Sequence, residues 1–451
     1  MSVSDTEALN SAKRPDVLVI GAGFSGLVAA RAFVKRGFDV QLVERHRQAG
    51  GLISTRRMPG QGEWLIETAA NGLLNSPLVE ELFREVGVEQ IFTKEESKRR
   101  YFWVNGRLSR WPLTLLESLR AVKGLITFKW RPPLKEESLS SWASRVFGAA
   151  FDRKVVRTGT LGIFAASADK LSANLIVGRF YRQSKTGSNK RRHRRGTTAP
   201  RLGMGTLIEG LERTLKASGV RFSYETDGSA VILEALSQGK QVVIATSAFE
   251  ARNILSRLLD SRRLSPEQIA KVSRLFSALS GVATRDLLSV GLLFGSPPET
   301  TGFGALLSQE PDVGGIEDGV LGVLQNGFIF PGRVAVGRHS ETWILSDDPN
   351  RRRFADLDDR TLVQRVLEKR RKVFPLSQQQ PLESFITRWR NAIPLYDVRL
   401  EAAQEVIRAE SGPILLFGNY VGSLGLQSIL EQVDQLVEKC AEQPVEMVRN
   451  K

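Results

Sequence analysis

The stretch that decides the fold is Gly21-Ala22-Gly23-Phe24-Ser25-Gly26, which follows a short apolar strand predicted at 16–20 and opens a helix predicted over 24–36. The first glycine permits a tight turn, the second lets a pyrophosphate approach the backbone, and the third lets the helix pack close to the strand. The start of the helix offers N–H groups and partial positive charge to phosphates. The stretch therefore predicts a nucleotide site contacted by Gly21, Gly23, Phe24, Ser25 and Gly26.

A second strand, predicted at 39–43, ends at Glu44, 23 residues after Gly21. An acid at this place accepts hydrogen bonds from both ribose hydroxyls and disfavours a 2′-phosphate, which argues against NADP. A glycine turn alone is also compatible with a purely structural role, in which it packs against its neighbours and binds no nucleotide. The order of strand, glycines, helix, strand and acid is more specific, and it favours a dinucleotide.

The composition is that of an ordinary soluble protein, with 451 residues, 41% hydrophobic and 25% charged. A chain of this length is expected to form two or three domains. No apolar run approaches the roughly 20 residues that a membrane-spanning helix needs. One cysteine, Cys440, excludes an internal disulfide, and three scattered histidines argue against a metal centre, so no metal site is predicted. These features favour the cytoplasm.

The positive charge is concentrated in one segment. Between Arg120 and Arg201 there are 19 Lys and Arg against four Asp and Glu, which accounts for the whole net charge of +15. A localised basic field attracts an anionic surface, either lipid head groups or nucleic acid. The run Lys190–Arg195 is read either as a solvated loop or as part of such a contact.

A second pair of glycines follows Glu44, in the run RHRQAGG from Arg45 to Gly51. This run resembles the extended dinucleotide signature of the amine oxidase-like flavoproteins, which makes FAD the expected cofactor rather than NAD. The resemblance implies further FAD contacts from a set of residues along the first segment: Glu44, Arg45, Gly50, Gly51, Leu52, Asn71 and Gly72. The family usually has an arginine where this chain has Gln48, a departure that weakens one phosphate contact without removing the backbone turn.

The end of the chain carries a second glycine-rich turn, GNYVGSLGL at Gly418–Leu426, between a strand and a helix. Read alone, it fits a structural strand-to-helix turn equally well. Flavoproteins of this group aim a last helix N-terminus at the cofactor, and this resemblance adds Ser423, Leu424 and Gly425 to the expected FAD contacts.

An ordered set of motifs resembles the oxygen-dependent protoporphyrinogen oxidases over most of the chain. The matching stretches are Lys98–Leu108 (KRRYFWVNGRL), Gly162–Ala166 (GIFAA), Gly203–Leu207 (GMGTL), Arg388–Tyr396 (RWRNAIPLY) and Gly418–Leu426. The family resemblance implies oxidation of protoporphyrinogen IX to protoporphyrin IX in haem biosynthesis, by repeated hydride transfer to FAD with molecular oxygen as acceptor. Such chemistry depends mainly on orienting a large apolar disc and needs no strong general base.

Three residues are expected to position that substrate. Arg100 matches the family's propionate-binding arginine, and its planar fork suits a carboxylate. Phe303 and Leu306 match apolar residues that sandwich the rings. A solvated basic edge for Arg100, and ordinary core positions for Phe303 and Leu306, remain the alternatives.

The expected fold is α/β. A Rossmann-type FAD-binding domain is built from residues 1–94, 203–271 and 407–451, with an α+β substrate domain at 95–108 and 272–406. A helical, basic insertion at 109–202 matches the family's membrane-contact region, and amphipathic stretches with basic charge suit a lipid interface. We expect a protein peripheral to the inner membrane on its cytoplasmic side. No nucleic-acid partner is expected, and a homodimer is left open.

Departures from the family pattern leave alternatives to the oxidation of protoporphyrinogen IX. Ala69, Ala70 and Ala166 replace residues of the motifs, and the segment from Gly219 to Ala245 is short for the usual pair of FAD-domain strands, so no adenine contact is assigned. The alternatives are oxidation of coproporphyrinogen III, another substrate such as an amine or a carotenoid, and an FAD-binding protein without activity.

Overall fold

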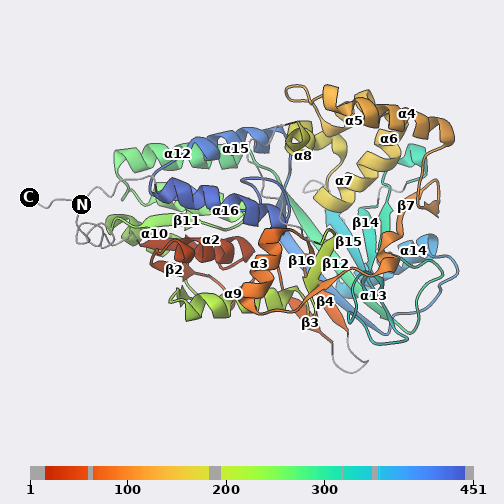
Figure 1. The fold of residues 1–451 in the computed structure, drawn as a ribbon, viewed down its shortest axis with the longest axis horizontal. Coiled ribbons are helices and arrows are strands. Elements are labelled where there is room, and N and C mark those ends of the chain that lie inside the picture. Colours follow the sequence, from red (N-terminus) through yellow and green to blue (C-terminus); the bar gives the residue numbers. More distant parts are fainter. Residues whose placement is uncertain are drawn as a thin grey trace, which may run out of the picture. The chain divides into compact units, whose positions relative to one another are not determined.

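The computed structural model describes residues 16–58, 64–181, 194–315, 318–347, 354 and 356–441 (Figure 1). The chain divides into a first unit, Met1–Gly51 with Ile208–Ser280 and Val406–Lys451, and a second unit, Leu52–Leu207 with Gly281–Glu405. The predicted α/β class, with a Rossmann-type domain assembled from separate segments, is confirmed. The individual domain limits remain predictions.

The first unit is built on a parallel sheet of five strands in the order β10-β2-β1-β11-β17. The strands are β1 (Val17–Ile20), β2 (Val40–Val43), β10 (Arg221–Ser223), β11 (Gln241–Ile244) and β17 (Ile414–Leu416). All four residues of β1 and of β11 are buried, as expected for central strands covered on both faces. Because the strands are parallel, their carboxyl ends meet at one edge.

The helices of this unit follow the strands. They are α2 (Phe24–Lys35), α10 (Gly228–Ser237), α11 (Ala248–Asp260), α12 (Pro266–Ser280) and α16 (Leu426–Ala441), while α9 (Met204–Ala217) and α15 (Val398–Ala409) include residues of both units. Helices α2 and α16 pack side by side. The segment from Gly219 to Ala245, read in the sequence as short for the usual pair of strands, contains both β10 and β11, with α10 connecting them.

The second unit is built on a mixed sheet of seven strands in the order β16-β12-β15-β14-β13-β7-β8. Its strands are β7 (Arg100–Val104), β8 (Arg107–Ser109), β12 (Thr284–Phe294), β13 (Gly304–Leu307), β14 (Val320–Gln325), β15 (His339–Asp347) and β16 (Glu383–Pro394). Two small sheets lie beside it: β3 (Thr55–Arg57) with β4 (Leu65–Glu67), and β9 (Thr197–Pro200) between β5 (Leu73–Leu74) and β6 (Gln90–Phe92). Helix α3 (Pro77–Val86) connects β5 to β6, and the short helix α13 (Asn326–Ile329) lies between β14 and β15.

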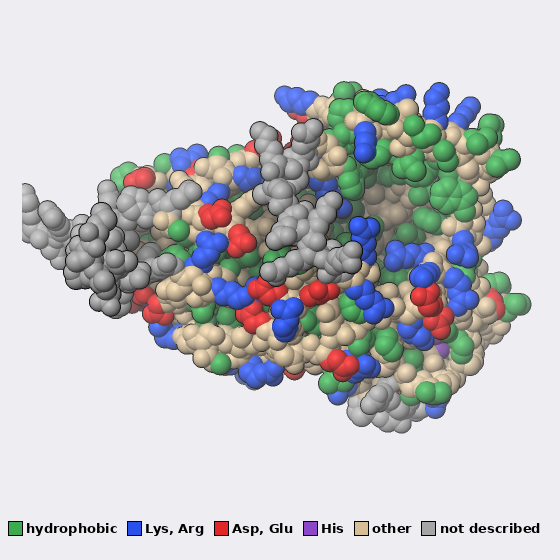
Figure 2. All heavy atoms as spheres, in the orientation of Figure 1, with side chains coloured by type: hydrophobic (Ala, Val, Ile, Leu, Met, Phe, Trp, Pro, Cys, Tyr) green, Lys and Arg blue, Asp and Glu red, His purple; other side chains and the backbone are tan. Residues whose placement is uncertain are grey.

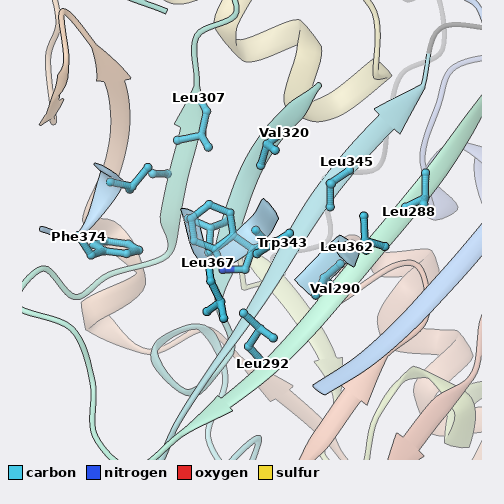
Figure 3. Packing of buried hydrophobic residues seen from close by; sticks show 14 of the residues in the cluster. Leu288, Val290, Leu292, Leu307, Val320, Trp343, Leu345, Leu362, Leu367 and Phe374 are labelled. Carbon is cyan, nitrogen blue, oxygen red and sulfur yellow. The ribbon is translucent and has the colours of Figure 1, made fainter. Parts of the chain in front are cut away.

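One face of the large sheet forms the core of the second unit. Alternate residues of its strands, among them Trp103, Leu307 and Trp343, are buried together with apolar side chains of α14 (Asp359–Val373) (Figure 3). Because side chains alternate along a strand, the intervening residues lie on the opposite face. That opposite face carries the candidate substrate-contacting residues described below.

The basic insertion is helical, as predicted. It contains α4 (Leu115–Thr127), α5 (Leu139–Phe147), α6 (Ala149–Phe151), α7 (Arg157–Phe164) and α8 (Ala173–Val177), with a π-helical turn at Asp152–Val156 between α6 and α7. Helix α4 begins with a capping box in which Thr114 and Glu117 bond each other's backbone N–H groups. Within the part of the chain that the structure describes, no helix has the length and apolar character to cross a bilayer.

The run Lys190–Arg195 falls mostly outside the described residues. Only Arg194 and Arg195 are described, and both are exposed.

Candidate functional site

The glycine turn of the first unit has the geometry that a pyrophosphate site needs. Gly21 has a φ of +102°, and a Cβ on Gly26 would lie 1.8 Å from the Gly21 carbonyl oxygen, so neither position accepts a side chain. A Cβ on Gly23 would meet nothing within 4 Å. Gly23 caps α2 without a side-chain hydrogen bond, which leaves the N–H groups of the first turn, including those of Phe24 and Ser25, to an external anion.

The Glu44 carboxylate is fixed at the carboxyl end of β2. Its Oε2 accepts a hydrogen bond from Ala22 N–H (2.8 Å) and its Oε1 one from His46 N–H (2.9 Å). The residue is buried, yet a carboxylate has about four lone-pair sites, so two remain for a ribose diol. The acid thus stands beside the glycine turn, as the sequence predicts.

The second glycine pair runs alongside the first turn. Gly50 N–H donates to Ala22 O (2.8 Å), and a Cβ on Gly51 would lie 3.3 Å from the Gly23 Cα. Both glycines have positive φ, +124° and +58°. Arg45, between Glu44 and this pair, forms an ion pair with Glu250 (3.1 Å).

The C-terminal turn precedes the N-terminus of α16, the helix that packs against α2. Ser423 and Leu424 are half-buried and Gly425 is exposed with a φ of +122°. In the first unit, these residues and the first glycine turn all follow strand ends on one sheet edge. The arrangement fits a dinucleotide with two helix N-termini near its phosphates.

The remaining predicted cofactor residues belong to the second unit. The Leu52 carbonyl accepts a hydrogen bond from Thr68 Oγ1 (2.7 Å). Gly72 admits no side chain, because a Cβ there would lie 2.7 Å from Thr198 O and 2.9 Å from the Phe330 ring. Asn71 beside it is half-buried.

The motif at Gly203–Leu207 is held by a buried ion pair of the second unit. Glu67 accepts hydrogen bonds from Met204 N–H (3.0 Å) and Thr55 Oγ1 (2.6 Å), and Arg333 lies 3.0 Å from the same carboxylate. Burial raises the pKa of the Glu67 carboxyl above its usual range, against the opposing effect of Arg333. Gly203, with a φ of +99°, leaves no room for a side chain beside Thr55. This pair therefore fixes the start of α9.

The face of the large sheet opposite its core carries a mainly apolar row of residues, which we call the platform. Strand register aligns Phe102 with Leu306, then Gly322, Ile344 and Ser289, across β7, β13, β14, β15 and β12. Phe102, Leu306, Ile344 and Ser289 are half-buried, and Gly322 has no side chain to stand above them. Neighbouring strands lie about 4.8 Å apart, so the five strands span roughly 19 Å.

Two neighbouring elements pack on this face of the sheet. Gly162 of α7 packs on Leu306, because a Cβ there would lie 2.2 Å from Leu306 Cδ2. On the other side, Ile66 of β4 covers Gly291, where a Cβ would lie only 1.6 Å from Ile66 Cδ1. The first residue of β7, Arg100, is exposed, and its guanidinium lies over the Phe303 ring, 4.5 Å from the centroid.

The structure therefore brings Arg100, Phe303 and Leu306 together at one end of the sheet. Gly304, the register partner of Arg100, has a φ of +141° and admits no side chain beside Val323 O. Phe102, Ile344 and Ser289 were not predicted from the sequence as site residues, because they lie on strands far apart in the chain. A strand pattern can be recognised locally in the sequence, but only the pairing register between strands places these three residues in one row.

Comparisons with known proteins agree with this geometry. A family model described as "Flavin containing amine oxidoreductase" matches residues 24–428. The chloroplastic protoporphyrinogen oxidase of Oryza sativa subsp. japonica is 24% identical over 92% of this chain and 86% of its own length.

Two solved structures share the fold. One, provisionally assigned as a protoporphyrinogen oxidase from Exiguobacterium sp. 255-15, has a TM-score of 0.68 at 16% identity and covers 96% of this chain and 100% of that one. A reduced UDP-galactopyranose mutase has a TM-score of 0.67 at 14% identity, with 96% of each chain covered. The predicted FAD cofactor is confirmed by the family match.

Proposed function

The chain belongs to the flavin containing amine oxidoreductase family, and we propose that it oxidises protoporphyrinogen IX to protoporphyrin IX in haem biosynthesis, with molecular oxygen as acceptor. The distant resemblance to the rice chloroplastic enzyme supports this substrate. The observation that carries the proposal is the platform.

The platform suits a large disc better than a small amine. Its half-buried side chains form a row roughly 19 Å wide, in which Gly322 separates the adjacent pair Phe102 and Leu306 from Ile344. A broad apolar ligand gains about 25 cal/mol for each Å² of apolar surface that such a row covers. A small amine would cover only part of it, whereas a tetrapyrrole macrocycle would cover most of it.

Arg100 supplies a carboxylate contact at one end of this row. The Phe303 ring beneath its guanidinium limits the orientations that the side chain adopts, so less freedom is lost on binding. A guanidinium binds a carboxylate through two parallel hydrogen bonds. Arg100 would thus fix one propionate edge while Leu306 and Phe102 contact the ring face.

The chain's residues need only bind and orient the substrate. FAD, when bound, supplies the hydride acceptor for this chemistry. None of the side chains in the row from Phe102 to Ser289 is ionisable. The platform would therefore act by holding a carbon bridge of the macrocycle in a fixed orientation and by excluding water, without a protein base.

Steady-state oxidation of protoporphyrinogen IX in air tests these roles. In Arg100→Met we expect the KM to rise about tenfold to a hundredfold, because one charged hydrogen-bond pair is lost. Arg107→Met removes an exposed arginine of the adjacent strand β8 and should leave the KM unchanged. Equal KM values in wild type and Arg100→Met would contradict the propionate role.

We further propose that the insertion holds the protein at the cytoplasmic face of the inner membrane. Helix α4 exposes a row of large apolar side chains, each more than half exposed: Leu115, Leu116, Leu119, Val122, Leu125 and Ile126. Trp111 before the helix and Trp130 after it are 54% and 76% exposed. Tryptophan is enriched at lipid–water interfaces, so the two rings suit both ends of a helix lying in the membrane surface.

Basic residues accompany this apolar surface. Arg120, Lys123 and Lys129 are exposed on or next to α4. Figure 2 shows hydrophobic side chains gathered with Lys and Arg over the region of α4 and α5, next to a hollow in the surface. Each cation near an anionic leaflet contributes about 1 kcal/mol.

Co-sedimentation with phosphatidylglycerol vesicles tests the membrane proposal. Leu119→Glu should reduce the bound fraction severalfold, whereas Val336→Glu, at a fully exposed apolar residue elsewhere in the second unit, should not. Binding that is equal for both variants and for wild type would exclude α4 as the contact.

A further inference from the structure

The two ends of the platform differ in charge. At the β7 end lies Arg100, an exposed cation whose guanidinium is over the Phe303 ring. Strand register places Ser289 at the opposite end of the row, four strand spacings or roughly 19 Å from Phe102. A ligand that lies along the row therefore meets a cation at one end and an uncharged hydroxyl at the other.

Ser289 is surrounded by uncharged side chains on its face of the sheet. Its register partners are Ile344 on β15 and Thr387 on β16. Because alternate residues of a strand share a face, the rows on either side add further neighbours. Among the residues of β12, β15 and β16, all of which the structure describes, those next to Ser289 on this face are all uncharged: Leu287, Gly291, Thr342, Ile344, Ser346, Phe385, Thr387 and Trp389.

Ser289 differs from its polar neighbours in being accessible. Trp389 donates its Nε1–H to Thr68 O (2.9 Å). The Thr387 Oγ1 is buried, whereas Ser289 is only half-buried. Ser289 therefore presents a polar but uncharged group to a ligand at this end of the platform.

Strand β4, which packs on this end of the face, brings no uncompensated positive charge. Its Ile66 covers Gly291, and its sequence, LIE, contains neither lysine nor arginine. The buried Glu67 of the same strand pairs with Arg333 (3.0 Å), so the charges of these two side chains balance. A carboxylate placed at the Ser289 end would lose water without gaining a cation, which costs free energy.

We propose that Ser289 is a specificity-determining residue, which restricts the platform to tetrapyrroles with carboxylates along one edge only. The inference rests on the proposed function. Protoporphyrinogen IX carries its two propionates on neighbouring rings, and its opposite edge carries vinyl and methyl groups. Coproporphyrinogen III has propionates in place of both vinyl groups, so with one edge on Arg100 it places a carboxylate near Ser289. The uncharged end therefore selects the dicarboxylate.

Fluorescence titration of flavin-loaded protein with the product porphyrins tests the proposal without turnover. Wild type should bind protoporphyrin IX at least about tenfold more tightly than coproporphyrin III. Ser289→Lys places an ammonium at the uncharged end, so it should tighten binding of coproporphyrin III and narrow that ratio about tenfold. Ser289→Ala leaves the end uncharged and should keep the wild-type ratio.

Ser296→Lys is the matched control, because it adds the same charge to an exposed serine just beyond the end of β12. Its ratio of affinities should equal that of wild type. Ile344→Lys is a second test variant, for the case that Ser289→Lys does not fold. It places an ammonium on the neighbouring strand of the same row and should narrow the ratio in the same direction.

The possible failures are distinguishable. Equal affinity of wild type for the two porphyrins, or an unchanged ratio in Ser289→Lys and Ile344→Lys, overturns the proposal and leaves a tetrapyrrole substrate in place. Equal narrowing in Ser296→Lys also overturns it, because the effect is then a general attraction between charges. A wild-type protein that binds neither porphyrin contradicts the proposed function itself, and the inference fails with it.

Discussion

The two units build their sites in different ways. In the first unit the cofactor edge is made largely of backbone, with glycines at 21, 26, 50 and 51 that admit no side chain or have positive φ, and one acid at Glu44. In the second unit the platform is made of side chains from five strands, aligned only by register. The first site needs particular residues at fixed spacing, whereas the second needs a flat surface that many apolar residues would provide.

We therefore expect substitutions in the glycine turn of the first unit to have larger effects than substitutions in the platform. In Gly26→Ala the new methyl group would lie 1.8 Å from Gly21 O, so the turn cannot keep its shape and bound flavin should be lost entirely. Flavin absorbance per protein after purification measures this. Gly23→Ala separates an effect on the cofactor from an effect on the fold, because its methyl group would meet no protein atom within 4 Å. It should leave the apoprotein's melting temperature unchanged and still weaken FAD binding.

Buried charge provides a second contrast between the units. In the second unit Glu341 is fully buried and accepts hydrogen bonds from Arg370 Nε (2.9 Å) and Trp343 Nε1 (2.8 Å). Glu341→Gln leaves the buried Arg370 charge unpaired, which should lower the free energy of unfolding by about 3 to 5 kcal/mol. Urea denaturation measures the loss. Glu383→Gln, half-buried on β16, is a control that should change it little.

In the first unit, by contrast, Lys271 on α12 is buried and its Nζ has no hydrogen-bond partner. Burial lowers the pKa of its ammonium from 10.5 to about 8. A lowered pKa means that the folded state binds protons less tightly than the unfolded state. Stability should therefore rise between about pH 8 and pH 10.5 and be lowest below pH 8.

Lys271→Met should remove that penalty and stabilise the protein at pH 7 by roughly 2 to 3 kcal/mol. The free energy of unfolding of wild type and variant, measured at pH 7 and at pH 10, checks both expectations. Lys271→Met should be stabilised relative to wild type by more at pH 7 than at pH 10. A destabilised variant at pH 7 would mean that the Lys271 charge has a stabilising partner.

The smallest expected effect concerns the platform. Ile344→Gln places a polar group in the middle of the row at similar volume, and its half-buried position should preserve folding. Loss of apolar contact with a macrocycle should lower kcat/KM about tenfold, with unchanged flavin content. A variant that loses FAD instead would show that Ile344 supports the fold.

The same contrast explains what the sequence could predict. The glycine turn, Glu44 and the last helix follow from local patterns, because their function depends on backbone conformation at fixed spacing. Arg100, Phe303 and Leu306 came only from resemblance to a family. Phe102, Ile344 and Ser289 were missed because strand pairing is not local. Helix α10 was not predicted, because the segment from Gly219 to Ala245 was read only as short for the usual pair of strands, whereas the structure places β10, α10 and β11 within it.

The most direct test of the proposed function is porphyrin fluorescence in air from purified, flavin-loaded protein given protoporphyrinogen IX or coproporphyrinogen III separately. We predict a rapid rise of porphyrin fluorescence with protoporphyrinogen IX, a much slower rise with coproporphyrinogen III, and a slowed rise with protoporphyrinogen IX in Arg100→Met. Faster oxidation of coproporphyrinogen III would identify coproporphyrinogen III as the substrate instead. A flavin-loaded protein that oxidises neither would retain the FAD site but contradict the platform as a tetrapyrrole surface.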